Sequence, residues 1–176
     1  MPLIAHEECV LVVVDAQPGF ARGEESVLER AAWLVTLAGA LDVPVVVTEE
    51  EPEVNGATDP RLVPPGAPVF LKPTFGLAGT PAILAAVRAP ARWTAVLVGF
   101  ETDVCVYQSA VGLLDAGFRV VAVEDAIGSP GEMHARGLAR LRDAGVALTH
   151  CKALGYEWVR TVEGASVLPR PAPFAL

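Results

Sequence analysis

The feature that most constrains the fold is a short apolar strand that leads directly into a helix. Residues 95–98 read Ala-Val-Leu-Val and are all apolar, as in a central strand that is buried on both faces of a parallel sheet. Gly99 breaks the apolar run, and Thr102 or Asp103 is placed to cap the helix that follows. Cys105 therefore falls in the first helical turn, at the carboxyl edge of the predicted sheet, where α/β proteins of this kind bind ligands.

Similar apolar segments recur along the chain and alternate with helical patterns. Further strands are predicted over residues 9–14, 43–48, 69–72, 118–124 and 146–149, and helices over 24–41, 80–88, 131–144 and 156–162. This alternation implies a mostly parallel sheet with right-handed crossovers and helices on both faces. Residues 49–68 form the longest segment without a predicted element, and loops of that length are commonly functional.

Composition and net charge argue against several classes of structure and function. The 176 residues have the length of a single domain spanning 1–176, and an apolar fraction of 52% with 19% charged residues argues against disorder. The net charge of −8, without any lysine or arginine run, argues against nucleic acid and anionic membranes as partners. No signal peptide or membrane-spanning run is recognisable, and three cysteines do not make a disulfide framework, so we expect a cytoplasmic protein.

Three polar residues follow predicted strands at the same edge of the sheet. Asp15 and Lys72 end the first and third strands, and Cys105 lies just beyond the fourth. A carboxylate can accept a thiol proton and an ammonium stabilises a thiolate, so the three would form a reactive group where they converge. The free amides and the positive end of the helix are expected to lower the pKa of Cys105 as well.

Each of these residues also has a purely structural interpretation. Cys105 can be a small buried apolar residue, Asp15 can cap the turn before Pro18, and Lys72 can be an ordinary solvated lysine. The acidic run at 49–51 is more typical of a solvated surface than of a binding site. The coincidence of three polar residues at strand ends favours a site.

The sequence contains no pattern typical of a metal or cofactor site. His6, His134 and His150 are scattered, without the spacing of metal ligands. No Gly-x-Gly-x-x-Gly follows the first strand, and no Gly-x-Ser-x-Gly elbow occurs. We therefore expect that the protein uses neither a metal nor a cofactor. We expect its substrate to be a small molecule.

Several segments together form a series of motifs. Residues 12–20 read Val-Val-Val-Asp-Ala-Gln-Pro-Gly-Phe, and residues 98–106 read Val-Gly-Phe-Glu-Thr-Asp-Val-Cys-Val. Lys72 is followed by a Gly-Thr helix start at 79–80, and Glu-Asp-Ala at 124–126 closes the fifth strand. In this order, the segments resemble the motifs of the isochorismatase-like cysteine hydrolase family. The nucleophile segment is most similar to the subgroup of isochorismatase-domain proteins without an assigned substrate.

The resemblance implies a role for each residue at the sheet edge. Cys105 would be the nucleophile, Asp15 the general base and later the acid, and Lys72 the cation that stabilises the thiolate. The family also has a non-proline cis peptide just before the nucleophile, which here would join Phe100 to Glu101. It would place the backbone N–H of Glu101 beside that of Cys105 as an oxyanion hole.

Two departures from the family pattern concern the substrate. Nicotinamidases carry an Asp-x-His metal site after the second strand, whereas residues 48–68 contain no histidine. Leu77 stands where the family often has an aromatic residue, and Gly76 replaces a frequent serine. The substrate can therefore not be taken from a characterised member.

We accordingly predict a three-layer, Rossmann-like α/β fold with a six-stranded parallel sheet in the order 3-2-1-4-5-6. The predicted activity is hydrolysis of a small amide, carbamoyl or related C–N bond through a thioester-type intermediate, using Asp15, Lys72 and Cys105. One alternative is an isochorismatase-type vinyl-ether hydrolase, although isochorismate-cleaving relatives commonly lack the cysteine. The other is a catalytically silent binding or scaffold protein. High apolar content and the resemblance both predict a homo-oligomer.

The pocket at the strand ends is expected to be apolar in its body and negative at its rim. Its predicted substrate-binding residues flank the strand ends and are Gln17, Phe20, Glu49, Phe75 and Phe100, with Glu101 and the loop at 49–52 forming part of the mouth. A negative rim disfavours isochorismate and N-carbamoyl acids and favours neutral or cationic amides. If the acidic run points into solvent instead, the pocket is neutral.

Overall fold

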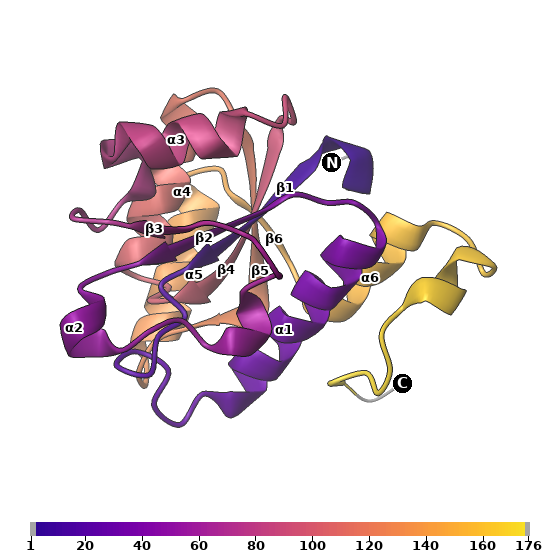
Figure 1. Ribbon diagram of the computed structural model, residues 1–176, viewed down its shortest axis with the longest axis horizontal. Helices are drawn as coiled ribbons and strands as arrows, with labels where there is room; N and C mark the ends of the chain where they lie inside the picture. The colour runs from indigo at the N-terminus through magenta and orange to yellow at the C-terminus, as the bar shows by residue number, and fades with distance from the viewer. Residues whose placement is uncertain (1–2, 175–176) are drawn as a thin grey trace.

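The computed structural model describes residues 3–174, and its strands form one sheet (Figure 1). The strands are β1 Cys9–Val14, β2 Val45–Glu49, β3 Val69–Leu71, β4 Thr94–Phe100, β5 Arg119–Gly128 and β6 Ala147–Thr149. They lie in the order β3-β2-β1-β4-β5-β6, and every neighbouring pair is parallel. The predicted sheet order is confirmed.

Helices cover both faces of this sheet (Figure 1). The helices are α1 Glu25–Ala40, α2 Pro52–Asn55, α3 Pro81–Arg88, α4 Cys105–Asp115, α5 Met133–Asp143 and α6 Cys151–Val159. Helices α1 and α6 pack on one face and α3, α4 and α5 on the other. Within residues 3–174, no helix is both long enough and apolar enough to cross a lipid bilayer.

Strand β1 explains why the first apolar run is continuous rather than alternating. Its odd-numbered residues, from Cys9 to Val13, join the core that contains α1 and α6. Its even-numbered residues, from Val10 to Val14, join the second core, which contains α3, α4 and α5. A strand that serves two cores buries both of its faces, so that each of its six residues is apolar and fully buried.

The register of the central strands fixes where the polar residues emerge. Val14, the last residue of β1, is paired with Thr48 of β2 and with Gly99 of β4. Gly99 has a φ of +111°, and a Cβ at this position would collide with the carbonyl oxygen of Val14. The glycine thus allows β4 to run close beside β1 up to the edge where Asp15 and Cys105 lie.

The last helix begins earlier than its sequence pattern predicts. It spans Cys151–Val159 instead of residues 156–162. The His150 side chain accepts a hydrogen bond from the N–H of Ala153 and caps the helix. Gly155 lies against the ring of Trp33, where a Cβ would collide with the ring carbons. The glycine therefore serves the close packing of α6 on α1 and does not interrupt the helix.

The segment predicted to be irregular also contains structure. Residues 49–68 include the short helix α2 and a 3-10 turn over Pro60–Leu62. The Asp59 side chain accepts from the N–H of Arg61 at 2.9 Å and caps this turn. These turns are too short for a period to be recognised in the sequence, because each spans about one helical repeat.

Candidate active site

Asp15 is the first residue after β1, and its side chain is completely buried. Its backbone has a φ of +46°, a conformation that is uncommon for residues other than glycine but is tolerated by aspartate. Oδ1 accepts a hydrogen bond from Thr48 Oγ1 at 2.8 Å, and Oδ2 lies 2.9 Å from Lys72 Nζ. Both carboxylate oxygens therefore have a partner inside the protein.

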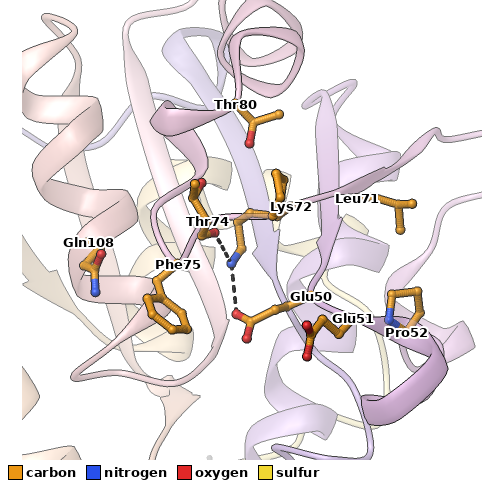
Figure 2. Close-up of a pocket in the computed structure, with 10 residues that line it drawn as sticks. Glu50, Glu51, Pro52, Leu71, Lys72, Thr74, Phe75, Thr80 and Gln108 are labelled. Carbon is orange, nitrogen blue, oxygen red and sulfur yellow. Dashed lines mark hydrogen bonds and ion pairs between the residues drawn. The ribbon is translucent and has the colours of Figure 1, made fainter.

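Lys72 follows β3, and its side chain is also fully buried. Its backbone N–H donates to the carbonyl of Glu49 at 2.8 Å, which continues the pairing of β2 with β3 by one residue. In addition to Asp15, Nζ contacts Glu50 Oε2 at 3.3 Å and donates to the carbonyl oxygen of Thr74 at 2.8 Å (Figure 2). The ammonium is thus shared between two carboxylates.

Cys105 is the first residue of α4 and is 3% exposed. Its Sγ donates a hydrogen bond to Glu50 Oε2 at 3.2 Å. Ligand-type atoms of Asp15, Glu50 and Cys105, one from each residue, all lie within 4.8 Å of one another. The strand order therefore brings together the three residues that the sequence placed at strand ends, and it adds Glu50 to them.

Glu50 is the one residue of this group that was not named individually from the sequence, where it appeared only within the 49–52 loop expected at the mouth of the pocket. Its peptide unit is held by Gln17, whose Oε1 accepts from the N–H of Glu50 at 2.8 Å and whose Nε2 donates to its carbonyl at 3.1 Å. Asn55 Nδ2 donates to the same carbonyl at 2.9 Å. Glu50 directly follows β2, so the strand-end rule that selected Asp15 could also have selected it.

The electrostatics of Cys105 differ from the expectation based on its helix position. Burial raises the pKa of the Cys105 thiol, the negative charge of Asp15 raises it further, and Glu50 adds to this, against an opposing effect of Lys72. The prediction that the helix start lowers this pKa is therefore wrong. The helix end contributes only a partial positive charge, whereas two carboxylates lie beside the sulfur. Cys105 is accordingly a thiol at neutral pH.

The pKa values of both members of the buried ion pair, Asp15 and Lys72, are raised. Burial raises the pKa of Asp15, and this effect outweighs the stabilising charge of Lys72. Burial alone would lower the pKa of Lys72, but the charge and hydrogen bond of Asp15, together with smaller effects of Cys105 and Glu50, outweigh burial and raise that pKa. The site therefore holds an ammonium at neutral pH together with a carboxylate that accepts a proton more readily than an exposed aspartate.

Among the described residues, this cluster is also the one whose side chains could together ligate a metal ion. Asp15, Glu50 and Cys105 could each offer one ligand atom. However, the Lys72 ammonium already lies 2.9 Å from Asp15 and 3.3 Å from Glu50, so a cation is built into the cluster. A second cation would be repelled by the first.

Two backbone amides near the start of α4 lack an acceptor among the described residues. The peptide bond between Phe100 and Glu101 is cis. Within residues 3–174, neither the N–H of Glu101 nor that of Cys105 donates to another residue, whereas the N–H groups of Thr102 and Val106 do. Cys105 is also the first helical residue, so its N–H has no intrahelical acceptor.

An open pocket of about 1010 Å³ adjoins this cluster (Figure 2). Glu50 and Lys72 border it, and they contact each other there. Thr74, Phe75 and Gln108 form part of its wall. Because Glu50 contacts both the pocket and the Cys105 sulfur, a molecule in the pocket meets Glu50 next to the thiol.

The residues predicted to bind substrate lie in different places. Phe75 is 52% exposed and borders the pocket, whereas Phe20 and Phe100 pack in the core that contains α1. Glu49 is nearly buried, and its Oε1 accepts the N–H of Thr58 at 2.6 Å. Gln17, fully buried and occupied with backbone groups, positions the loop after β2.

Comparisons with known proteins agree with this geometry. Residues 9–152 match the isochorismatase domain family. The chain is 32% identical over 154 residues to isochorismatase domain-containing protein 2 of Rattus norvegicus, covering 84% of this chain and 73% of the relative. It is 31% identical over 162 residues to isochorismatase domain-containing protein 2A of Mus musculus, covering 89% of this chain and 78% of the relative.

Solved structures with a similar fold include two close matches. The YcaC gene product of Escherichia coli, an octameric hydrolase of unknown specificity, has a TM-score of 0.87 at 23% identity, covering 96% of this chain and 89% of that one. The MAR1 ribonuclease of Caenorhabditis elegans has a TM-score of 0.85 at 26% identity, covering 99% and 98%. The first likeness concerns the fold alone.

Proposed function

This chain belongs to the isochorismatase family, and we propose that it is a cysteine-dependent hydrolase of a small amide, carbamoyl or related C–N compound. The observation that best supports this activity is the meeting of a buried thiol, a buried carboxylate and a buried ammonium at the carboxyl edge of the sheet. Covalent hydrolysis needs a nucleophile, a group that takes its proton and a source of positive potential. The three groups supply these functions without a cofactor.

In the first half-reaction, Cys105 attacks and Asp15 acts as general base. Asp15 takes the thiol proton while Sγ bonds to the carbonyl carbon and the carbonyl π electrons move onto oxygen. When the tetrahedral intermediate collapses, the C–N bond breaks and the leaving nitrogen takes the proton from Asp15. The product is an acyl thioester on Cys105. A base is required because the thiol of Cys105 is protonated at neutral pH.

Water completes the reaction through the same two residues. Asp15 accepts a proton from water as the water oxygen bonds to the thioester carbon. The C–S bond then breaks, sulfur regains the proton, and the acid product leaves. The raised pKa of Asp15 suits this exchange, because a base holds and returns protons best when its pKa lies closer to the working pH.

Lys72 and the free amides stabilise the negative charges that develop on sulfur and on the carbonyl oxygen during the reaction. Lys72 Nζ lies between two carboxylates beside the sulfur and offsets the negative charge that develops there. The N–H groups of Glu101 and Cys105 would bind the oxyanion of the tetrahedral intermediate. Loss of one such donor typically costs a factor of about 10² to 10³ in rate.

A ribonuclease activity has less support. The Caenorhabditis elegans neighbour is named a ribonuclease. This chain carries a net charge of −8, and Glu50 and Glu51 border the pocket. A phosphate backbone would meet repulsion there rather than the positive surface that nucleic-acid binding needs.

A homo-oligomer remains part of the proposal. The Escherichia coli neighbour is octameric. In this chain Leu71 and Phe75 are exposed beside the pocket, and Trp93 is 68% exposed elsewhere. We expect sedimentation at micromolar concentration to show a species larger than the 18.4 kDa chain, with a single 18.4 kDa species contradicting the expectation.

A substrate panel tests the activity directly. Small amides, N-carbamoyl acids and isochorismate are assayed with the wild type, with Cys105→Ala and with Cys151→Ala, a buried cysteine outside the site. We expect turnover of one or more C–N substrates, lost on the order of 10³-fold or more in Cys105→Ala and retained in Cys151→Ala. Peptide mapping after incubation with a radiolabelled substrate should show the acyl group on Cys105.

Other results would assign the chain to one of the alternatives. Turnover of isochorismate that survives Cys105→Ala would indicate a vinyl-ether hydrolase. No turnover across the panel, with equal and slow alkylation of all three cysteines, would indicate a silent binding or scaffold protein.

A further inference from the structure

Three consecutive glutamates lie at the end of β2 and just beyond it, but they face different surroundings. Glu49 is nearly buried and bonded to the N–H of Thr58. Glu51 is exposed and has a φ of +42°. Between them, Glu50 directs its carboxylate to Lys72 Nζ (Figure 2) and also accepts a hydrogen bond from Cys105 Sγ. The acidic run is therefore not one charged rim: it places a single carboxylate next to the nucleophile.

The position of this carboxylate is built by the fold. The Glu50 peptide unit makes two hydrogen bonds to Gln17, and Asn55 adds a third. Gln17 is completely buried and is held in turn by the carbonyl of Gly56 at 2.6 Å. Because these bonds use the backbone of Glu50, none of the three is lost when its side chain is exchanged.

Glu50 gives the resting site an excess of negative charge on the side that a substrate meets. With a neutral thiol, the charges beside the sulfur are Asp15, Glu50 and Lys72, which sum to one negative charge. Asp15 is fully buried and engaged by Thr48 and Lys72, whereas the Glu50 side chain is 17% exposed and borders the pocket. Lys72 also borders the pocket, but its side chain is fully buried, so that Glu50 is the charge of this group most accessible to an incoming molecule.

We infer that Glu50 is the specificity-determining residue of this site and that it selects substrates carrying a positively charged amine close to the scissile carbonyl. This inference rests on the proposed C–N hydrolase activity. The Glu50 carboxylate exchanges its hydrogen bond from Cys105 for one from the substrate ammonium. The thiol proton is thereby released toward Asp15, so binding of the correct substrate prepares the nucleophile. A carboxylate at the same place on a substrate is repelled.

Charged alkylating reagents test the selection at the thiol itself. The rate of Cys105 modification is measured by peptide mapping with neutral iodoacetamide, anionic iodoacetate and cationic 2-bromoethylamine. Dividing each rate by the iodoacetamide rate of the same variant cancels any change in the thiolate fraction. The variants are Glu50→Gln and the matched control Glu53→Gln, which removes a charge from the exposed face of α2 three residues away.

We expect Glu50→Gln to raise the iodoacetate ratio about tenfold and to lower the 2-bromoethylamine ratio by a similar factor, because one elementary charge a few ångströms away is removed. Glu53→Gln should leave both ratios unchanged. A merely structural role of Glu50 would change all three rates by the same factor and leave the ratios unmoved. That result, or an equal response of Glu53→Gln, would overturn the inference.

A series of amides that differ in the group attached to the methylene then separates this inference from the proposed function. Glycinamide, propionamide and malonamate differ in charge at one position, and kcat/KM is compared in the wild type and Glu50→Gln. We expect the wild type to have its highest kcat/KM with glycinamide. In Glu50→Gln, the ratio of kcat/KM for glycinamide to that for malonamate should be about tenfold smaller than in the wild type. If Cys105-dependent turnover occurs but the preference does not depend on Glu50, the inference fails while the hydrolase stands. If the alkylation ratios shift but no C–N substrate is turned over, the hydrolase fails and charge selection by Glu50 stands.

Discussion

At the residue scale, the centre of the site is Lys72, whose single ammonium is shared by two carboxylates. Its side chain is fully buried, as is that of Asp15, and the Glu50 side chain is 17% exposed. Burying charges is costly, and the cost is offset only while each charge keeps its partner. Removing the ammonium would leave Asp15 and Glu50 close together without a counter-charge, so this contact should matter for stability as well as for chemistry.

Replacing Lys72 by methionine tests this balance. We expect Lys72→Met to lower the free energy of unfolding at pH 7 by about 3–5 kcal/mol, because it leaves a buried carboxylate unpaired. The deficit should shrink on acidification, since burial already raises the pKa of Asp15 and a protonated Asp15 no longer needs a cation. Urea unfolding at pH 7 and at lower pH measures both effects.

The chain supplies a matched control, since Lys152 is its other lysine. Lys152→Met should change the free energy of unfolding by less than about 0.5 kcal/mol. The double variant Asp15→Asn/Lys72→Met should recover part of the lost stability, because it removes both members of the pair. If Lys72→Met lowers the free energy of unfolding by the same amount at every pH, the loss of stability does not come from the unpaired carboxylate.

At the element scale, helix α6 depends on a close approach to α1. Gly155 lies in the middle of α6, and a Cβ there would collide with the ring of Trp33. Trp33 is held from its other side, because its Nε1 donates to the carbonyl of Pro169 at 2.8 Å. The ring therefore has little freedom to move away, and the glycine is required by packing rather than by its backbone angles.

Two glycine-to-alanine variants should shift stability in opposite directions. Gly155→Ala is expected to lower the free energy of unfolding by about 1–3 kcal/mol, as overpacking does in other cores. Gly39→Ala, in α1, meets no atom within 4 Å and should raise it by about 0.5–1 kcal/mol through helix propensity. Thermal and urea unfolding check both signs. Equal effects of the two variants would show that helix propensity, and not packing, governs Gly155.

At the scale of the whole molecule, three buried thiols make stability sensitive to alkaline pH. Burial raises the pKa of Cys9 to about 12 and raises those of Cys105 and Cys151 as well. An unfolded thiol titrates near pH 8.5, so above about this pH the unfolded chain loses protons that the folded chain keeps. The free energy of unfolding should then fall as pH rises, by about 1.4 kcal/mol per pH unit for each thiol.

Cys151→Ala isolates one of these contributions. Cys151 lies outside the site, and its Sγ contacts the carbonyl of Arg30. Between about pH 8.5 and pH 10.5 the variant should show a slope that is smaller than that of the wild type by about 1.4 kcal/mol per pH unit. Only the slope is compared, because loss of the packing of the sulfur atom lowers stability at every pH. Identical slopes would indicate that the thiol titrates normally in the folded protein.

The sequence alone determined the sheet order and the convergence of Asp15, Lys72 and Cys105. Apolar runs such as the one at Cys9–Val14 identify strands buried on both faces, and parallel strands place their following residues at one edge. The parallel sheet and its shared edge follow from local pattern and from general rules of topology, and the strand order was predicted with the family resemblance added. None of these features needs knowledge of individual side-chain contacts.

Only the tertiary structure decided the direction of Glu50 and the protonation of Cys105. Glu50 faces the thiol because Gln17, 33 positions earlier, binds its peptide unit, and no local pattern encodes that contact. The pKa of Cys105 is raised because burial and carboxylates from other strand ends outweigh the helix end that local reasoning had considered. Interactions between residues distant in sequence set both properties, since electrostatic interactions and hydrogen bonds between loops act through space rather than along the chain.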